Sequence, residues 1–119
     1  MEREITKVVL LKEVCNDMCH NWYFLCYGKL YNNDKTKYKS CKFVICIDSE
    51  DLWEYYEGKE RYTDRQVREH VKFLACENLW SFAKDYNNLS DFYAWCNETI
   101  ENYNSTLRDE IKKPLSMTL

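Results

Sequence analysis

The sequence predicts an α+β fold in which a three-stranded antiparallel sheet, a meander, is followed by three helices packed on one face. The first half of the chain holds three stretches rich in β-branched and aromatic residues, and the second half holds apolar residues at helical spacing. Runs of strands followed by runs of helices are typical of α+β proteins. The chain has 119 residues, and we expect residues 1–119 to form a single compact domain.

The composition favours regular elements. Hydrophobic residues make up 45% of the chain and aromatic residues 16%, whereas there are only two glycines and one proline. This supplies enough apolar surface for a core and little material for glycine-rich phosphate loops. The formal net charge of −3 argues against a general polyanion binder, because such a protein needs a basic face.

Three strands are expected in the first half of the chain. The first covers about residues 5–14, where four apolar residues follow one another. The next segment, residues 15–21, has the Asn and Asp residues typical of a turn. The second strand, about 22–31, should therefore run antiparallel beside the first. The third, about 38–47, follows the polar tip NNDKTK and completes a hairpin.

The two-residue period of a strand predicts how the hairpin pairs. Three apolar residues on one face of the second strand, Trp22, Phe24 and Cys26, should lie opposite Ile47, Ile45 and Phe43 respectively. The helices must cover the hydrophobic face that results. The other face, with Tyr23, Tyr27 and Tyr31, is amphipathic. A homodimer through this face and a monomer are both open.

Three helices are expected, over about residues 49–57, 63–85 and 91–112. Acidic residues favour the first turn of the first helix, and Gly58 favours its end. The second opens with Thr63-x-x-Gln66, the pattern of a capping box. The third ends before Pro114.

Seven cysteines are many for this length, but their odd number and spacing match no small secreted disulfide framework. The N-terminus, MEREITK, lacks a signal-peptide pattern, and no apolar run reaches the ~20 residues of a membrane span. We therefore expect a cytoplasmic protein with reduced, mostly buried thiols and no membrane association. The Asn-x-Ser/Thr triplets at Asn88, Asn97 and Asn104 are then chance matches.

One cluster suggests metal ligands. Cys15, Cys19 and His20 could supply part of a zinc site, since zinc sites often take two close ligands from a turn. A strand cysteine, Cys41, Cys46 or Cys26, could complete the four ligands. However, the tight Cys-x2-Cys pattern is missing, and strand alternation explains the strand cysteines as core residues. We expect no metal and no other cofactor, and the turn cluster is the weaker alternative.

No catalytic signature is present. The sequence lacks GxGxxG, GxxxxGK[ST], HExxH and a Ser-His-Asp order. A cysteine nucleophile needs a base within hydrogen-bond reach. His70 and Cys76 fall on different sides of one predicted helix, and the adjacent Cys19 and His20 diverge on an extended backbone. We therefore expect that the protein is not an enzyme.

Charged residues gather instead in two places. The predicted acidic surface follows the third strand and combines carboxylates with aromatic residues: Asp48, Glu50, Asp51, Trp53, Glu54, Tyr55 and Glu57. Glu50, Glu54 and Glu57 fall near one face of the first helix. Such a ridge could dock into a basic groove that otherwise holds nucleic acid. The simpler interpretation is a polar outer helix face.

The predicted basic surface is the hairpin between the second and third strands. It interleaves lysine and tyrosine: Lys29, Tyr31, Lys35, Lys37, Tyr38, Lys39 and Lys42. Lysine beside exposed aromatic rings is typical of surfaces that bind single-stranded nucleic acid. The simpler interpretation is a solvated hairpin whose lysines protect a sheet edge.

These features predict a small non-catalytic intracellular binding protein that occupies a partner's surface through the acidic helix and the Lys/Tyr hairpin. A specific version is an inhibitor encoded by a phage or mobile element and directed at a host nucleic-acid-handling defence enzyme, which would place it in the host cytoplasm. In being short, acidic and single-domain the chain is similar to the anti-CRISPR proteins, with no motif in common. The alternative is a nucleic-acid-binding accessory or regulatory protein that uses the Lys/Tyr hairpin.

Overall fold

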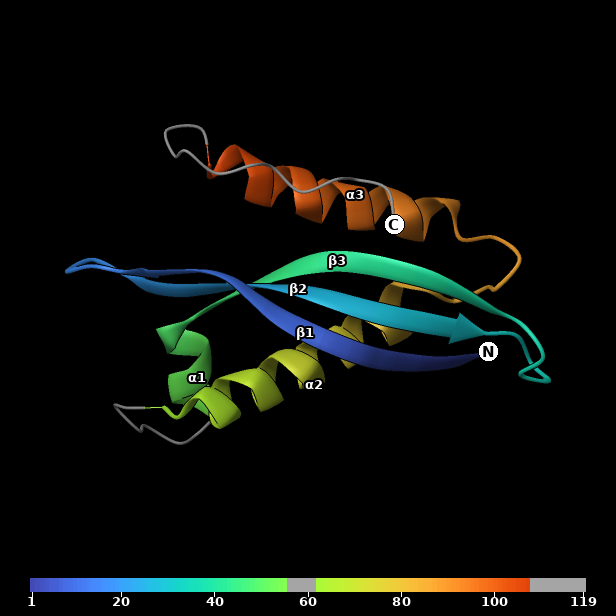
Figure 1. The fold of residues 1–119 in the computed structure, drawn as a ribbon, viewed down its shortest axis with the longest axis horizontal. Coiled ribbons are helices and arrows are strands. Elements are labelled where there is room, and N and C mark those ends of the chain that lie inside the picture. The colour runs from blue at the N-terminus through green and yellow to red at the C-terminus, as the bar shows by residue number, and fades with distance from the viewer. Residues whose placement is uncertain (56–61, 108–119) are drawn as a thin grey trace.

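A computed structural model describes residues 1–55 and 62–107, with the backbone alone at residues 53–55. The three strands are β1 (Glu2–Cys15), β2 (His20–Tyr31) and β3 (Tyr38–Asp48), and the helices are α1 (Ser49–Tyr55), α2 (Asp64–Phe82) and α3 (Ser90–Ser105). The strands form one antiparallel sheet in the order β1-β2-β3. The predicted α+β class is confirmed (Figure 1).

The predicted pairing of the hairpin is confirmed residue by residue. Trp22, Phe24 and Cys26 of β2 lie opposite Ile47, Ile45 and Phe43 of β3. The pairing of β1 with β2 is less regular, because the register shifts between Ile5 and Lys7 and again between Leu10 and Lys12. Two bulges of this kind were not predicted from the sequence. They change which side chains of β1 share a face.

One face of the sheet, here called the inner face, carries the main core. Trp22, Phe24, Cys26, Leu30, Cys41, Phe43, Ile45 and Ile47 are buried there together with Val8. α2 covers this face with the stripe Val67, Val71, Ala75 and Leu79, all at most 5% exposed. α1 adds Leu52, which is fully buried. The stripe recurs at steps of four residues, as the helical period requires.

α3 lies along β3 and reaches both faces of the sheet. Its first half contributes Phe92 and Cys96 to the main core, as predicted. Its second half buries Ile100 and Tyr103 in a smaller cluster on the opposite, outer face, together with Leu25 and Val44. The outer face is therefore covered at one end, a feature that the sequence did not predict. Figure 1 shows α2 and α3 on opposite sides of the ribbon of strands.

The helix ends follow local signals. Thr63 forms the predicted capping box with Gln66: the Thr63 side chain accepts from the Gln66 amide, and the Gln66 side chain accepts from the Thr63 amide. α2 ends three residues earlier than predicted, because the backbone of Ala83 leaves the helical region with φ −97° and ψ 84°. The predicted continuation of α3 beyond residue 107 lies outside the described residues, as do residues 56–57 of the predicted first helix.

Within residues 1–55 and 62–107, no helix has both the length and the apolar character needed to cross a bilayer.

Candidate interaction surfaces

In the part of the predicted acidic surface that the structure describes, most of the carboxylates bond to backbone amides at the start of α1. The Asp48 amide donates to Asp51 Oδ2 at 3.0 Å, and the Asp51 amide donates to Asp48 Oδ1 at 2.9 Å. These two carboxylates therefore hold the turn from β3 into α1, a structural role. Glu50 and Asp51 are exposed. The side chains of Trp53, Glu54 and Tyr55, and all of Glu57, lie outside the described part.

Most of the cations in the predicted basic surface have partners within the fold. The Lys29 ammonium lies 4.5 Å from the centre of the Tyr38 ring. The Lys39 ammonium lies 4.4 Å from the centre of the Tyr86 ring and donates to the Tyr86 carbonyl at 2.9 Å. Lys37 is exposed and Lys42 is half-buried. Lys39 is therefore less available to an external ligand than the sequence indicates.

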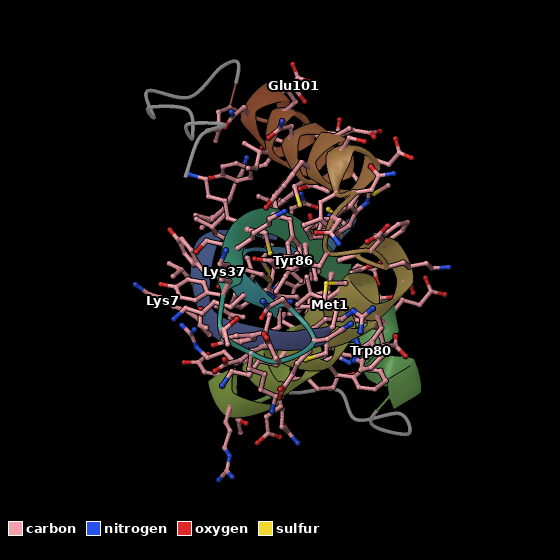
Figure 2. All side chains as sticks on the ribbon, turned by 90° about the vertical axis from the view of Figure 1, so that its right-hand side faces the viewer. Met1, Lys7, Lys37, Trp80, Tyr86 and Glu101 are labelled. Atoms are coloured by element: carbon pink, nitrogen blue, oxygen red, sulfur yellow. The ribbon has the colours of Figure 1, made fainter. Side chains whose placement is uncertain are left out.

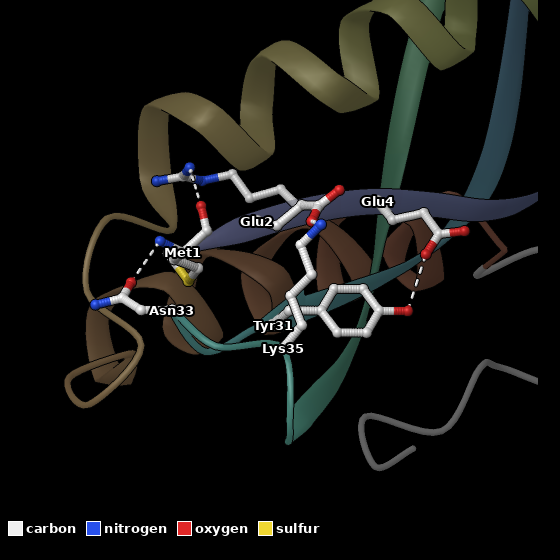
Figure 3. Close-up of polar contacts among 7 residues, drawn as sticks. Met1, Glu2, Glu4, Tyr31, Asn33 and Lys35 are labelled. Atoms are coloured by element: carbon white, nitrogen blue, oxygen red, sulfur yellow. Dashed lines mark hydrogen bonds and ion pairs between the residues drawn. The ribbon is translucent and has the colours of Figure 1, made fainter.

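The tip of the hairpin is also joined to the start of β1. Lys35 forms an ion pair with Glu2, and the Tyr31 hydroxyl donates to Glu4 Oε2 at 2.9 Å. The terminal ammonium of Met1 donates to Asn33 Oδ1 at 2.9 Å (Figure 3). The bond to Glu4 raises the pKa of Tyr31 above its ordinary value. These contacts fix the hairpin tip against β1.

The weaker metal candidate lies on the turn between β1 and β2. Cys15 and Cys19 are exposed there, and His20 Nε2 is 2.7 Å from Glu13 Oε1. The His20 ring centre lies 3.8 Å from that of Trp22. Among the described residues, no three His, Cys, Asp or Glu side chains are gathered in a way that could hold a metal ion.

The seven cysteines all lie in the described part of the chain, and each is a free thiol. Cys26 and Cys41 are buried, as predicted. The prediction that Cys46 belongs to the core is wrong, because Cys46 lies opposite Tyr23 on the outer face and is exposed. His70 and Cys76 both belong to α2, where His70 is buried and Cys76 is exposed, so the predicted separation of this pair is confirmed.

A surface that the sequence analysis missed lies on the side of α2 that points away from the core. Phe73, Cys76 and Trp80, here called the aromatic stripe, follow one another at steps of three and four residues. Phe73 is 44% exposed and Trp80 63%. With Glu77 and Ser81 they line a shallow groove of about 570 Å³. The seven-residue spacing of Phe73 and Trp80, which puts both on one side of a helix, is the sequence signal that could have predicted this surface.

Trp80 is supported from one side by β1. The Arg3 guanidinium lies 4.0 Å from the centre of the Trp80 ring. Arg3 is itself fixed, because its Nε donates to the Ala83 carbonyl at 2.9 Å and its Nη1 donates to the Met1 carbonyl at 3.0 Å. Partial burial lowers the pKa of Arg3 from its ordinary value. Trp80 is therefore held in place although most of its surface is exposed (Figure 2).

One acidic group lies beside the aromatic stripe, because Glu77 lines the groove. Asp51 of α1 is close enough to the first half of α2 that its charge acts on the buried His70. Figure 1 shows α1 beside the start of α2. The groove therefore has a carboxylate from Glu77 and, at Trp80, the Arg3 guanidinium.

Comparison with known proteins finds no family model, no curated protein and no solved structure that matches the chain.

Proposed function

We propose that the protein is a non-catalytic binding protein that covers part of another protein's surface, with the aromatic stripe of α2 at the centre of the contact. The observation that carries this proposal is the exposure of Trp80 and Phe73, 63% and 44%, on the outer side of α2. Aromatic residues are enriched at protein interfaces, and Trp is among the commonest hot-spot residues. Apolar groups at such a site gain stability when a partner removes them from water.

The fixed position of Trp80 supports this proposal. A side chain that is already held loses little conformational freedom when a partner binds, so more of the contact energy appears as affinity. The Arg3 guanidinium, 4.0 Å from the ring centre, provides this support. Cys76, small and exposed, lies between the two aromatic residues and leaves room for a side chain of the partner.

The carboxylate in the groove indicates the charge of the partner. Glu77 lines the groove and is exposed, and such a group favours a partner with a cation at the facing position. Basic surfaces are typical of enzymes that handle nucleic acid. The specific form of the proposal is an inhibitor, encoded by a phage or mobile element, that acts in the host cytoplasm on a defence enzyme of this kind. Its mode of action would be similar to that of anti-CRISPR proteins.

Affinity purification from a host lysate tests the proposal when three forms are compared. They are the wild-type protein, a Phe73→Ala/Trp80→Ala variant, and a Met18→Ala control that alters an exposed apolar residue on the turn between β1 and β2. Circular dichroism checks that all three fold. We expect a partner retained by the wild type and by the control, and an affinity at least about tenfold lower for the double variant. Equal retention by all three would contradict the proposal.

Analytical ultracentrifugation of the same proteins addresses self-association. A wild-type dimer that the double variant loses would identify a second copy as the occupant of the stripe, and would replace the proposed enzyme partner. Glu77→Lys should slow association with a basic partner, most strongly at low salt.

A nucleic-acid function is the second candidate. Because Lys35 and Lys39 have partners within the fold, the hairpin tip is no longer its best location. The observation that favours this function is that lysine and tyrosine side chains lie next to one another on the outer face of the sheet.

A further inference from the structure

Within the described residues, α3 covers the outer face of the sheet over only part of its length. At one end Leu25 and Val44 are buried beneath Ile100 and Tyr103 of α3. Beyond this cluster the next row across the sheet consists of Lys7, Tyr27 and Lys42, which are direct ladder partners on β1, β2 and β3. Lys7 is exposed, and Tyr27 and Lys42 are half-buried. A tyrosine is thus flanked by a lysine on each neighbouring strand.

This row exists because of a β1 bulge. The register shift between Ile5 and Lys7 places Lys7 opposite Tyr27. The Lys7 ammonium lies 5.8 Å from the centre of the Tyr27 ring. Two residues further along β2, Lys29 lies on the same face, with its ammonium 4.5 Å from the centre of the Tyr38 ring. The face therefore carries three lysines beside two tyrosine rings.

The carboxylates on this face are already engaged. Glu4 accepts the Tyr31 hydroxyl, and Glu2 pairs with Lys35 of the hairpin tip. Glu4 keeps its charge and is the ladder partner of Lys29, whereas Lys7 and Lys42 both have Tyr27 as a ladder partner. The row of Lys7, Tyr27 and Lys42 is therefore the basic part of this face, on a protein whose formal net charge is −3.

We propose that this surface, here called the Lys–Tyr face and defined by Lys7, Tyr27, Lys29, Tyr38 and Lys42, binds single-stranded nucleic acid. The lysine ammonium groups match the negative phosphates of an extended strand. Residues two apart on a β-strand are separated by about 6.6 Å, and neighbouring strands by about 4.8 Å, so several cations reach one short stretch of backbone. Tyr27 and Tyr38 offer ring faces on which unpaired bases stack, as aromatic residues on sheet surfaces do in RNA-binding modules.

This proposal is independent of the aromatic stripe. Figure 2 shows Lys7 and Trp80 on opposite sides of the molecule. If one surface shows no binding in its own assay, the proposal for the other surface therefore still stands. An acidic protein segment is the competing occupant, because it shares the negative charge but lacks bases that stack.

Fluorescence anisotropy with labelled single-stranded oligonucleotides tests the proposal on the full chain across a range of salt concentrations. The wild type should bind with an affinity that falls linearly with salt on logarithmic axes. Lys7→Gln and Lys42→Gln should each lower that slope by about 0.7, the value for one phosphate contact on a single strand. Tyr27→Leu should weaken binding and leave the slope unchanged, because it removes a stacking ring and no charge.

Lys72→Gln is the matched control, since Lys72 is an exposed lysine on α2, away from the Lys–Tyr face. It should bind as the wild type does. The proposal is overturned if no binding is measured at 50 mM salt, or if Lys72→Gln weakens binding as much as Lys7→Gln. It is also overturned if polyglutamate competes as well as unlabelled oligonucleotide, because the face would then be selective for charge alone.

Discussion

The backbone amide of Val44 donates a hydrogen bond to Thr99 Oγ1 over 2.9 Å, and this bond joins the edge of the sheet to the middle of α3. The Thr99 hydroxyl in turn donates to the Cys96 carbonyl at 2.7 Å. β3 is an edge strand, and an uncovered edge offers amide groups to other chains. α3 thus satisfies at this point a group that a fourth strand would otherwise satisfy.

Replacement of Thr99 by Val should destabilise the protein. The variant keeps the shape of the side chain but leaves the Val44 amide without its acceptor, and a buried donor without a partner costs about 1–3 kcal/mol. Urea denaturation of Thr99→Val and of the control Thr99→Ser measures the difference. The serine variant retains the hydroxyl and should lose clearly less. Equal stability of the two variants would show that the hydrogen bond contributes nothing.

Gly28→Ala should also lower the free energy of unfolding. A Cβ atom at Gly28 would lie 2.9 Å from Cys41 Sγ and 3.3 Å from both the Glu4 carbonyl and Leu79 Cδ1. Overpacking of this kind typically costs about 1–3 kcal/mol. Thermal or urea denaturation checks the value.

A double variant identifies the cause of that loss. Cys41→Ala removes the closest atom, so Gly28→Ala should cost less in its presence than in the wild type. If Gly28→Ala costs the same in both backgrounds, the clash with Cys41 is not its origin.

Stability should fall as the pH is lowered from about 7 to 5, through His70. This residue is 5% exposed, and burial lowers its pKa below its ordinary value, although the charges of Asp51 and Glu77 act in the opposite direction. The unfolded chain, in which the pKa is about 6.5, therefore binds a proton before the folded protein does. The contribution of His70 to the free energy of unfolding is complete above that value, and it is lost as the pH falls towards the folded-state pKa.

Urea denaturation at several pH values between 5 and 7.5 measures this dependence. His70→Phe should flatten it, because the titrating group is removed. His20→Gln is the control, since His20 is the other histidine of the chain and is exposed enough to contact Glu13 at the surface. A His70→Phe variant with the wild-type pH dependence would contradict the assignment.

The thiols should react in two groups. Burial raises the pKa of Cys26 and of Cys41 to about 12 and raises that of Cys96 as well. Cysteine reacts as the thiolate, so these three should be modified only after unfolding. The exposed cysteines should react in the native state; they are Cys15, Cys19, Cys46 and Cys76. Iodoacetamide labelling followed by mass spectrometry of peptides distinguishes the groups, and native labelling of Cys26 would count against the burial of the β2 core.

The sheet was predictable because its signals are local. The alternation of Trp22, Phe24 and Cys26 sets their face, and the polar tip sets the register against β3. The capping box at Thr63 and Gln66 is likewise defined within four residues. The β1 bulges have no comparable signal, since an extra residue on a strand depends on how the partner strand twists.

The interaction surfaces were less predictable, because exposure is a property of the whole fold. Lys39 is engaged by Tyr86, 47 residues away in the sequence, and no local pattern indicates that contact. Phe73 and Trp80 fit the apolar content of a core helix, so their residue types alone do not distinguish them from the buried stripe. Their exposure follows from the sheet, which covers only one side of α2.

The two bulges of β1 have a consequence for behaviour at high concentration. β1 forms the edge of the sheet opposite β3, and its ladder is interrupted between Ile5 and Lys7 and between Leu10 and Lys12. A strand from another molecule could not pair along a long regular row of amides at this edge, because bulges twist an edge away from flat pairing. Because α3 joins the opposite edge at Val44, we expect the sheet to resist growth into fibrils at both edges.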